Sequence, residues 1–160
     1  MIYRLAVFAM LCLAVAAPSA AQGRVCTNVS GRLNEYIMPR GSSGDPFGRI
    51  IGIVKGDLEG SVTAFLTTFV PSANGNVHVT NNHVFANTAG DQLFTRGAAD
   101  WWIQLPGFFW VDMTLVIQGG SGKYESATGS IKLRGIGLGP APGTGQFIDD
   151  YKGEICVTQS

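Results

Sequence analysis

The side chains that could carry out chemistry are few and widely spaced along the chain. The two histidines, His78 and His83, are five residues apart. Successive residues of a strand point to opposite faces, so an odd spacing places these two imidazoles on opposite sides of a sheet. They therefore cannot chelate one metal ion together, and no third ligand has a suitable spacing. The sequence predicts no metal site and no cofactor.

His83 shares its alternation with Val77, Val79 and Phe85, which predicts that this face of the strand lines an apolar interior. A histidine in such surroundings is either a core or rim residue with satisfied hydrogen bonds, or the acid/base or hydrogen-bonding group of a pocket. His83, Phe85 and Val79 are therefore candidate pocket residues.

The carboxylates and nucleophiles form no recognisable catalytic constellation. Glu59 follows the polar alternation of its predicted strand and is expected on the outer face, and the adjacent Asp149 and Asp150 diverge across a sheet. The chain has no Gly-x-Ser-x-Gly elbow and no His-Glu-x-x-His helix. Any catalysis would have to guide a reactive molecule within an apolar cavity, without a cofactor.

Large aromatic residues cluster on either side of a Pro106-Gly107 turn, in segments 100–103 and 108–111. Because neighbours on a strand face opposite ways, at least one large aromatic side chain of each cluster should point outward. The outward rings could pack at the hairpin tip, form an oligomer interface, or provide an aromatic platform for a ligand. Trp101 and Trp102 complete the set of candidate pocket residues.

Residues 1–21, which contain Cys12, are predicted below to be a cleaved signal peptide, and their removal leaves two cysteines, Cys26 and Cys156. An even number of cysteines in a chain expected to be exported favours a disulfide. A nucleophilic or metal-binding thiol is the alternative, but neither cysteine has a Cys-x-x-Cys partner or a nearby histidine. A Cys26–Cys156 bridge would make the first and last strands neighbours, as in a closed barrel or a sandwich with adjacent termini.

Residues 1–21 have the pattern of a cleaved secretory signal peptide. Arg4 precedes an apolar run from Leu5 to Ala17, and small residues follow at positions that suit signal peptidase. The run has roughly 13 residues, whereas a transmembrane helix needs about 20. We therefore expect a mature domain of residues 22–160, secreted or periplasmic, with no membrane span after cleavage.

Composition excludes several classes of protein. Eleven basic and eleven acidic side chains give a formal net charge of zero, which argues against a nucleic-acid partner. Charged residues make up only 14% and glycine is frequent, with 22 residues, so neither a disordered chain nor a helical bundle fits.

What remains is an all-β chain. Strands are predicted at 33–38, 56–70, 77–86, 92–104, 108–118, 127–135 and 147–157, with loops at 39–49 and 135–145. Within 56–70 the inward set is Leu58, Val62, Ala64, Leu66 and Val70. Seven or eight antiparallel strands with short connections predict a single-domain up-and-down barrel or sandwich, without repeats.

The most specific motif is the glycine-rich stretch from Gly119 to Gly129, followed by an alternating strand. It predicts a hairpin in which Gly119, Gly120, Gly122 and Gly129 permit close approach and positive φ, with Tyr124 tucked under the turn. A phosphate-binding loop is rejected, because Lys123 is not followed by Ser or Thr and no helix follows.

This pattern resembles the hairpin of the allene oxide cyclase and dirigent-like barrel superfamily, and of its secreted bacterial members in particular. The resemblance extends over roughly residues 50–157 and includes the stretches 56–60, 83–85, 90–93 and 151–156. It implies a closed eight-stranded antiparallel barrel with an apolar interior, often trimeric in the plant families. The plant cyclases' pocket residues have no matched positions in this chain, so the resemblance concerns the fold.

Two functional classes remain open on these grounds. The first is a secreted barrel that binds a small hydrophobic molecule in its interior without catalysis, or has a structural or assembly role. The second is a cofactor-free cyclase-like or dirigent-like enzyme. A polar acid/base group projecting into the interior would favour the second class, because a carrier needs only shape.

Overall fold

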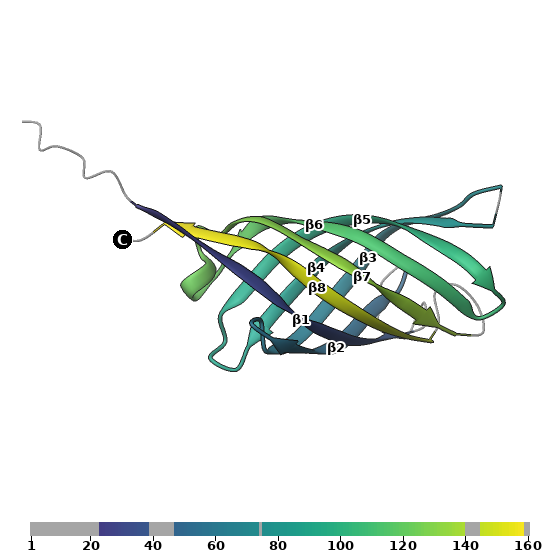
Figure 1. Ribbon diagram of the computed structural model, residues 1–160, viewed down its shortest axis with the longest axis horizontal. Coiled ribbons are helices and arrows are strands. Elements are labelled where there is room, and N and C mark those ends of the chain that lie inside the picture. The colour runs from purple at the N-terminus through teal and green to yellow at the C-terminus, as the bar shows by residue number, and fades with distance from the viewer. Residues whose placement is uncertain (1–22, 39–46, 74, 140–144, 159–160) are drawn as a thin grey trace, which may run out of the picture.

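A computed structural model describes residues 23–38, 47–73, 75–139 and 145–158, and these form a closed antiparallel barrel of eight strands (Figure 1). The strands are β1 (Arg24–Met38), β2 (Arg49–Gly56), β3 (Gly60–Pro71), β4 (Val77–Asn87), β5 (Gln92–Leu105), β6 (Phe108–Gly120), β7 (Thr128–Leu138) and β8 (Gly145–Thr158). A single turn of 3-10 helix, η1 (Gly122–Tyr124), connects β6 to β7. No helix among the described residues is long and apolar enough to cross a membrane.

Each strand pairs with the next along the chain, and β1 closes the barrel by pairing with β8. Cys26 and Cys156 lie directly opposite each other in this last pairing and form a disulfide. Figure 1 shows that the bridged ends of β1 and β8 extend together beyond the body of the barrel. The predicted closed antiparallel barrel and the predicted disulfide are therefore confirmed. The predicted signal peptide lies outside the described residues.

Strand β2 was not predicted from the sequence, and β1 is longer than the predicted 33–38. The sequence Arg-Ile-Ile-Gly-Ile-Val-Lys-Gly of β2 has apolar residues at both alternations. Ile50 and Val54 are buried while Ile51 and Ile53 are exposed, so no period of two is visible in the sequence. Of the predicted loops at 39–49 and 135–145, residues 39–46 and 140–144 lie outside the described residues. At the edges of these loops, Arg49 already belongs to β2 and β7 continues to Leu138.

The predicted strand 56–70 begins too early, and the face predicted for its last residue, Val70, is wrong. The chain turns at residues 57–59, so Leu58 is a turn residue whose side chain is buried at the end of the barrel. Farther along β3, the register shifts between Leu66 and Thr68. An extra residue at such a bulge reverses the alternation that follows it. Val70, predicted to point inward, is therefore 56% exposed.

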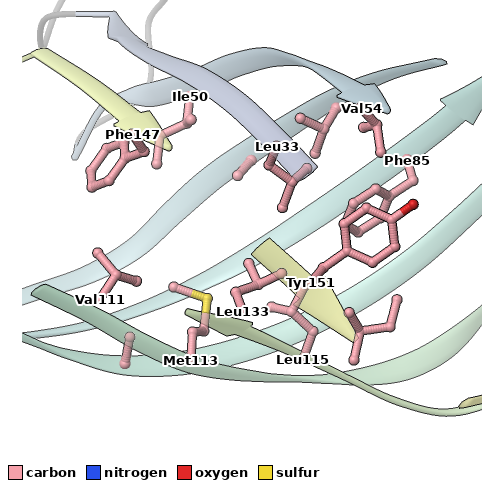
Figure 2. Close-up of a cluster of buried hydrophobic side chains, with 14 of the residues drawn as sticks. Leu33, Ile50, Val54, Phe85, Val111, Met113, Leu115, Leu133, Phe147 and Tyr151 are labelled. Carbon is pink, nitrogen blue, oxygen red and sulfur yellow. The ribbon is translucent and has the colours of Figure 1, made fainter. Parts of the chain in front are cut away.

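The inward side chains of all eight strands form the hydrophobic core that fills the interior. Figure 2 shows part of this core, with labelled residues from β1, β2, β4, β6, β7 and β8. At one end, Leu58 and Tyr124 are buried, and the Leu58 N–H donates a 2.9 Å hydrogen bond to the Tyr151 hydroxyl. At the other end, near the β5–β6 and β7–β8 connections, the rings of Phe109 and Phe147 contact Trp101. The barrel thus has one end closed by aliphatic and tyrosine packing and one end lined by aromatic rings.

Candidate functional site

Five polar side chains point into the otherwise apolar interior and are buried. They come from β1, β4, β5 and β8: Glu35, Asn81, His83, Thr95 and Asp149. Charged side chains are almost never fully buried unless they are paired. This group is therefore the strongest candidate for a functional site in the described part of the chain.

Glu35 and Asp149 form a carboxyl pair on adjacent strands. Asp149 lies opposite Leu33 and Glu35 lies opposite Phe147, so the two carboxyl groups are diagonal neighbours on the inner face. Glycine provides their space on the flanking strands. A Cβ on Gly52 would lie 2.7 Å from Glu35 Cγ, and a Cβ on Gly135 would overlap the Asp149 carboxyl.

Burial raises the pKa of both carboxyl groups. Desolvation, followed by the charge of Asp149, raises the pKa of Glu35 to about 8. Desolvation, followed by the charge of Asp150, raises the pKa of Asp149 to about 7. A low-dielectric interior penalises the charged form, and two nearby carboxylates disfavour double ionisation. The pair therefore retains at least one proton near neutral pH and can both donate and accept hydrogen bonds.

The second half of the polar group lies on β4 and β5. His83 is directly opposite Thr95, and its ring stacks on Phe85 with centroids 5.9 Å apart. Desolvation lowers the pKa of His83 to about 4, so its imidazole is neutral at pH 7. Asn81 donates from Nδ2 to the Met113 sulfur at 3.4 Å.

Six buried polar atoms have no hydrogen-bond partner among the described residues. They are Glu35 Oε1, Asn81 Oδ1, His83 Nδ1, Thr95 Oγ1, Trp101 Nε1 and Asp149 Oδ1. An unsatisfied buried donor or acceptor costs about 1–3 kcal/mol. Such a concentration of unpartnered groups is unusual for a purely structural core, in which buried polar groups are hydrogen-bonded.

Of the candidate pocket residues, His83, Phe85, Val79 and Trp101 are buried in the interior. Trp102 is not part of it: the side chain lies on the outer face of β5 and is 39% exposed. The reason is the alternation itself, since Trp101 takes the inward position and its neighbour must point outward.

Glu35, Asn81 and Thr95 were not predicted from the sequence as site residues, and Asp149 was given no role. The signal that could have found them is a polar residue at the inward position of an apolar alternation. Glu35 is such a residue, because the inward Leu33 and Ile37 lie two positions before and after it. Asp149 is another, with the inward Phe147 and Tyr151 on either side. Nothing local indicates that the two carboxyl groups meet, because β1 and β8 are brought together only by closure of the barrel.

The other residues that the sequence singled out lie away from this group. Glu59 is exposed, as expected, and His78 on the outer face contacts Asp100 at 2.8 Å. The glycine-rich segment connects β6 to β7, with Gly119, Gly122 and Gly129 at positive φ and Tyr124 buried beneath the turn.

One group of three potential metal ligands lies together among the described residues. Cys26, Glu154 and Cys156 have ligand atoms within 4.8 Å of one another. The two cysteine sulfur atoms form the disulfide, so neither is available as a thiolate. This cluster therefore does not constitute a metal site in the oxidised protein.

Fold and site together define a class: a closed, disulfide-bridged, eight-stranded antiparallel β-barrel with a carboxyl pair and a neutral histidine buried in an apolar interior. No protein-family model matches the chain, and neither does any curated protein. Among solved structures it is similar to a pterocarpan synthase dirigent protein, with 12% identity over 86% of this chain and 93% of that chain and a TM-score of 0.35. At these values the similarity supports no conclusion about activity, and the fold assignment rests on the strand pairing itself.

Proposed function

We propose that the barrel binds a small, largely apolar molecule in its interior and holds it by a few directional hydrogen bonds. The observation that carries this proposal is the set of six buried, unpartnered polar atoms within an apolar lining. The side chains that fill the interior would have to move apart to admit a ligand. Its donor and acceptor groups would then satisfy these atoms, while its apolar body would contact the aliphatic and aromatic walls. A purely hydrocarbon ligand would leave these atoms unsatisfied and is a poorer fit.

The proposed route of entry is the aromatic end of the barrel. The opposite end is closed by Leu58 and Tyr124, and the Leu58–Tyr151 hydrogen bond fixes that closure. A molecule that enters past Trp101 would reach the carboxyl pair from the aromatic side. Rotation of the Trp101 ring, which contacts Phe109 at a centroid distance of 5.3 Å, would have to accompany entry.

Native mass spectrometry of the non-reduced protein purified from its own source tests this proposal, with spectra before and after extraction into organic solvent. We expect an additional mass below about 1,000 Da that extraction removes; occupied sites of about 300–1,000 Å³ hold molecules of this size. A protein that is empty in every preparation, and that does not raise the fluorescence of the uncharged probe N-phenyl-1-naphthylamine, would contradict interior binding.

A matched pair of variants locates the binding site. Thr95→Val removes an inward hydroxyl with little change in volume, and Thr114→Val removes an outward one from the neighbouring strand. If the extracted molecule accepts or donates a hydrogen bond at Thr95, its affinity should fall about five- to tenfold in Thr95→Val, which corresponds to roughly 1–1.4 kcal/mol. Thr114→Val should bind as the wild type does. Equal affinities in all three proteins would place the ligand elsewhere.

A second candidate function is cofactor-free proton transfer to the bound molecule. The specific observation in its favour is the carboxyl pair, whose raised pKa values of about 8 and about 7 suit a general acid and a general base near neutral pH. One carboxyl group would donate a proton while the other, as a carboxylate, accepts one. The pair would thus supply the inward acid/base group that a cofactor-free enzyme requires.

Incubation of the extracted molecule with the protein distinguishes an enzyme from a carrier. An enzyme would convert it to a product that chromatography separates even when its mass is unchanged, and Glu35→Gln or Asp149→Asn would retain binding but lose conversion. A molecule recovered unchanged after prolonged incubation with the wild type would support a carrier.

We also propose that the chain is exported. The Cys26–Cys156 disulfide supports this, because such bridges persist in oxidising compartments. Mass spectrometry of the protein recovered outside the cytoplasm tests it: a mature N-terminus near residue 22 and a mass two protons below that of the dithiol are expected. A protein retained in the cytoplasm with two free thiols would contradict it.

A further inference from the structure

The outer face of β5 and β6 carries two exposed tryptophans side by side. Trp102 and Trp110 are directly opposite each other in the β5–β6 pairing, and they are 39% and 49% exposed. Their inward neighbours, Trp101 and Val111, belong to the core, so the alternation holds both indoles outside. Directly opposed side chains of an antiparallel pair have Cβ atoms about 4.5–5.5 Å apart. The two indoles therefore leave the outer face from neighbouring positions, and the ring of Phe108 contacts that of Trp110 at a centroid distance of 5.8 Å.

Both indoles line a groove of about 560 Å³ on the outside of the barrel. The groove continues across β7 and β8 to β1, and its principal side chains are Arg32, Trp102, Trp110, Asp112, Arg134 and Asp150. Its volume lies within the range of about 300–1,000 Å³ typical of small-molecule sites. It is separate from the interior site, because it opens on the opposite face of the sheet.

Two arginine–aspartate pairs border the tryptophans. Arg32 Nε contacts Asp150 Oδ1 at 2.9 Å, and Arg134 Nε contacts Asp112 Oδ2 at 3.1 Å. Each contact uses Nε, so with respect to the described residues the terminal guanidinium nitrogens remain available to donate to a ligand. Exposed pairs of this kind add little to stability, typically about 0–1 kcal/mol.

The charges of the groove select the kind of ligand. The lining of the groove has no net charge, because two arginines and two aspartates cancel, but Lys132 adds a positive charge at its edge, where the ammonium group contacts Asp112 at 3.2 Å. It offers flat apolar faces beside fixed donors and acceptors. A pyranose ring has the complementary chemistry: a face of C–H groups that packs on an indole, and hydroxyls around its edge that both donate and accept.

We propose that this outer groove binds a neutral saccharide, with its rings stacked on Trp102 and Trp110 and its hydroxyls bonded to the arginine–aspartate pairs. The proposal is independent of the interior function. It also specifies the class of ligand: an uncharged glycan with exposed C–H faces, as β-linked glucans and xylans have.

Titration of the full-length mature protein with four hexasaccharides tests the proposal: cellohexaose, xylohexaose, laminarihexaose and maltohexaose. We expect at least one to bind saturably by calorimetry and to change the tryptophan emission. Trp102→Ala and Trp110→Ala should each weaken that binding by about tenfold or more, and Arg134→Ala should weaken it as well. Phe94→Ala is the matched control, because Phe94 is an exposed aromatic residue of the same strand outside the groove.

Three results would overturn the proposal. One is that no hexasaccharide binds at millimolar concentration while circular dichroism shows the protein to be folded. Another is that both tryptophan variants bind as tightly as the wild type does. The third is that light scattering shows an oligomer that Trp110→Ala dissociates, with no saccharide binding, which would make this face an interface between copies of the chain.

Discussion

Replacing the buried carboxylic acid Glu35 by its amide should alter how stability depends on pH. The pKa of Glu35 rises from 4.5 to about 8 on folding, because burial removes the carboxyl from water and Asp149 adds negative charge. Between these values the folded chain holds a proton that the unfolded chain releases. The contribution of Glu35 to the free energy of unfolding is therefore fully present below pH 4.5 and is lost as the pH rises toward about 8.

The size of the effect follows from this shift. Each unit of pKa shift corresponds to about 1.4 kcal/mol, so raising the pH from 5 to 7 should remove about 2–3 kcal/mol of the stability that depends on Glu35. Glu35→Gln keeps the shape of the protonated acid and cannot ionise. The variant should match the wild type within about 1 kcal/mol at pH 5, and should be more stable by about 2–3 kcal/mol at pH 7.

Urea unfolding of the non-reduced protein, followed by tryptophan fluorescence at half-unit pH intervals from 5 to 8, measures this slope. Glu59→Gln makes the same chemical change at an exposed position and should leave the slope of the wild type intact. Asp149→Asn should likewise reduce the loss of stability with rising pH, because the pKa of Asp149 is also raised, to about 7. If Glu35→Gln and the wild type have parallel slopes, Glu35 is ionised in the folded protein and the reasoning fails.

Three further changes test the elements that position the site. Replacing Cys26 and Cys156 together by serine should lower the free energy of unfolding by about 4–5 kcal/mol in the chain-entropy model, because the bridge closes a loop of about 130 residues; a loss below about 1 kcal/mol in urea would refute this. Tyr151→Phe removes the partner of the buried Leu58 N–H and should cost about 1–3 kcal/mol, with faster amide hydrogen exchange at Leu58; unchanged exchange would contradict it. Gly129→Ala forces a side chain into a φ of +124° and should lower the free energy of unfolding by at least about 1–2 kcal/mol, which a lower thermal midpoint would show. The same change at the unstrained Gly23 should leave the thermal midpoint unchanged.

The sequence by itself determined most of the strands, most of their inner and outer faces, and the closing disulfide. These properties depend on short stretches of sequence or on a residue count: a period of two assigns His83, Phe85 and Val79 to one face, and only Cys26 and Cys156 remain to pair once the predicted signal peptide is set aside. The period of two is missing from a strand that has apolar residues on both faces, and it is interrupted where a bulge adds a residue. β2 has apolar residues on both faces, and the bulge in β3 reverses the positions of Thr68 and those that follow.

Only the tertiary structure decided which residues meet. Glu35 and Asp149 are far apart in the chain, and their juxtaposition follows from the closure of the barrel and the β1–β8 register. The same holds for Trp102 and Trp110, whose opposition depends on where the β5–β6 hairpin turns. Hydrogen-bond register is a property of two strands together, and neither strand's sequence contains it. Desolvation likewise depends on everything that surrounds a group, so the raised pKa of the carboxyl pair exists only in the folded barrel.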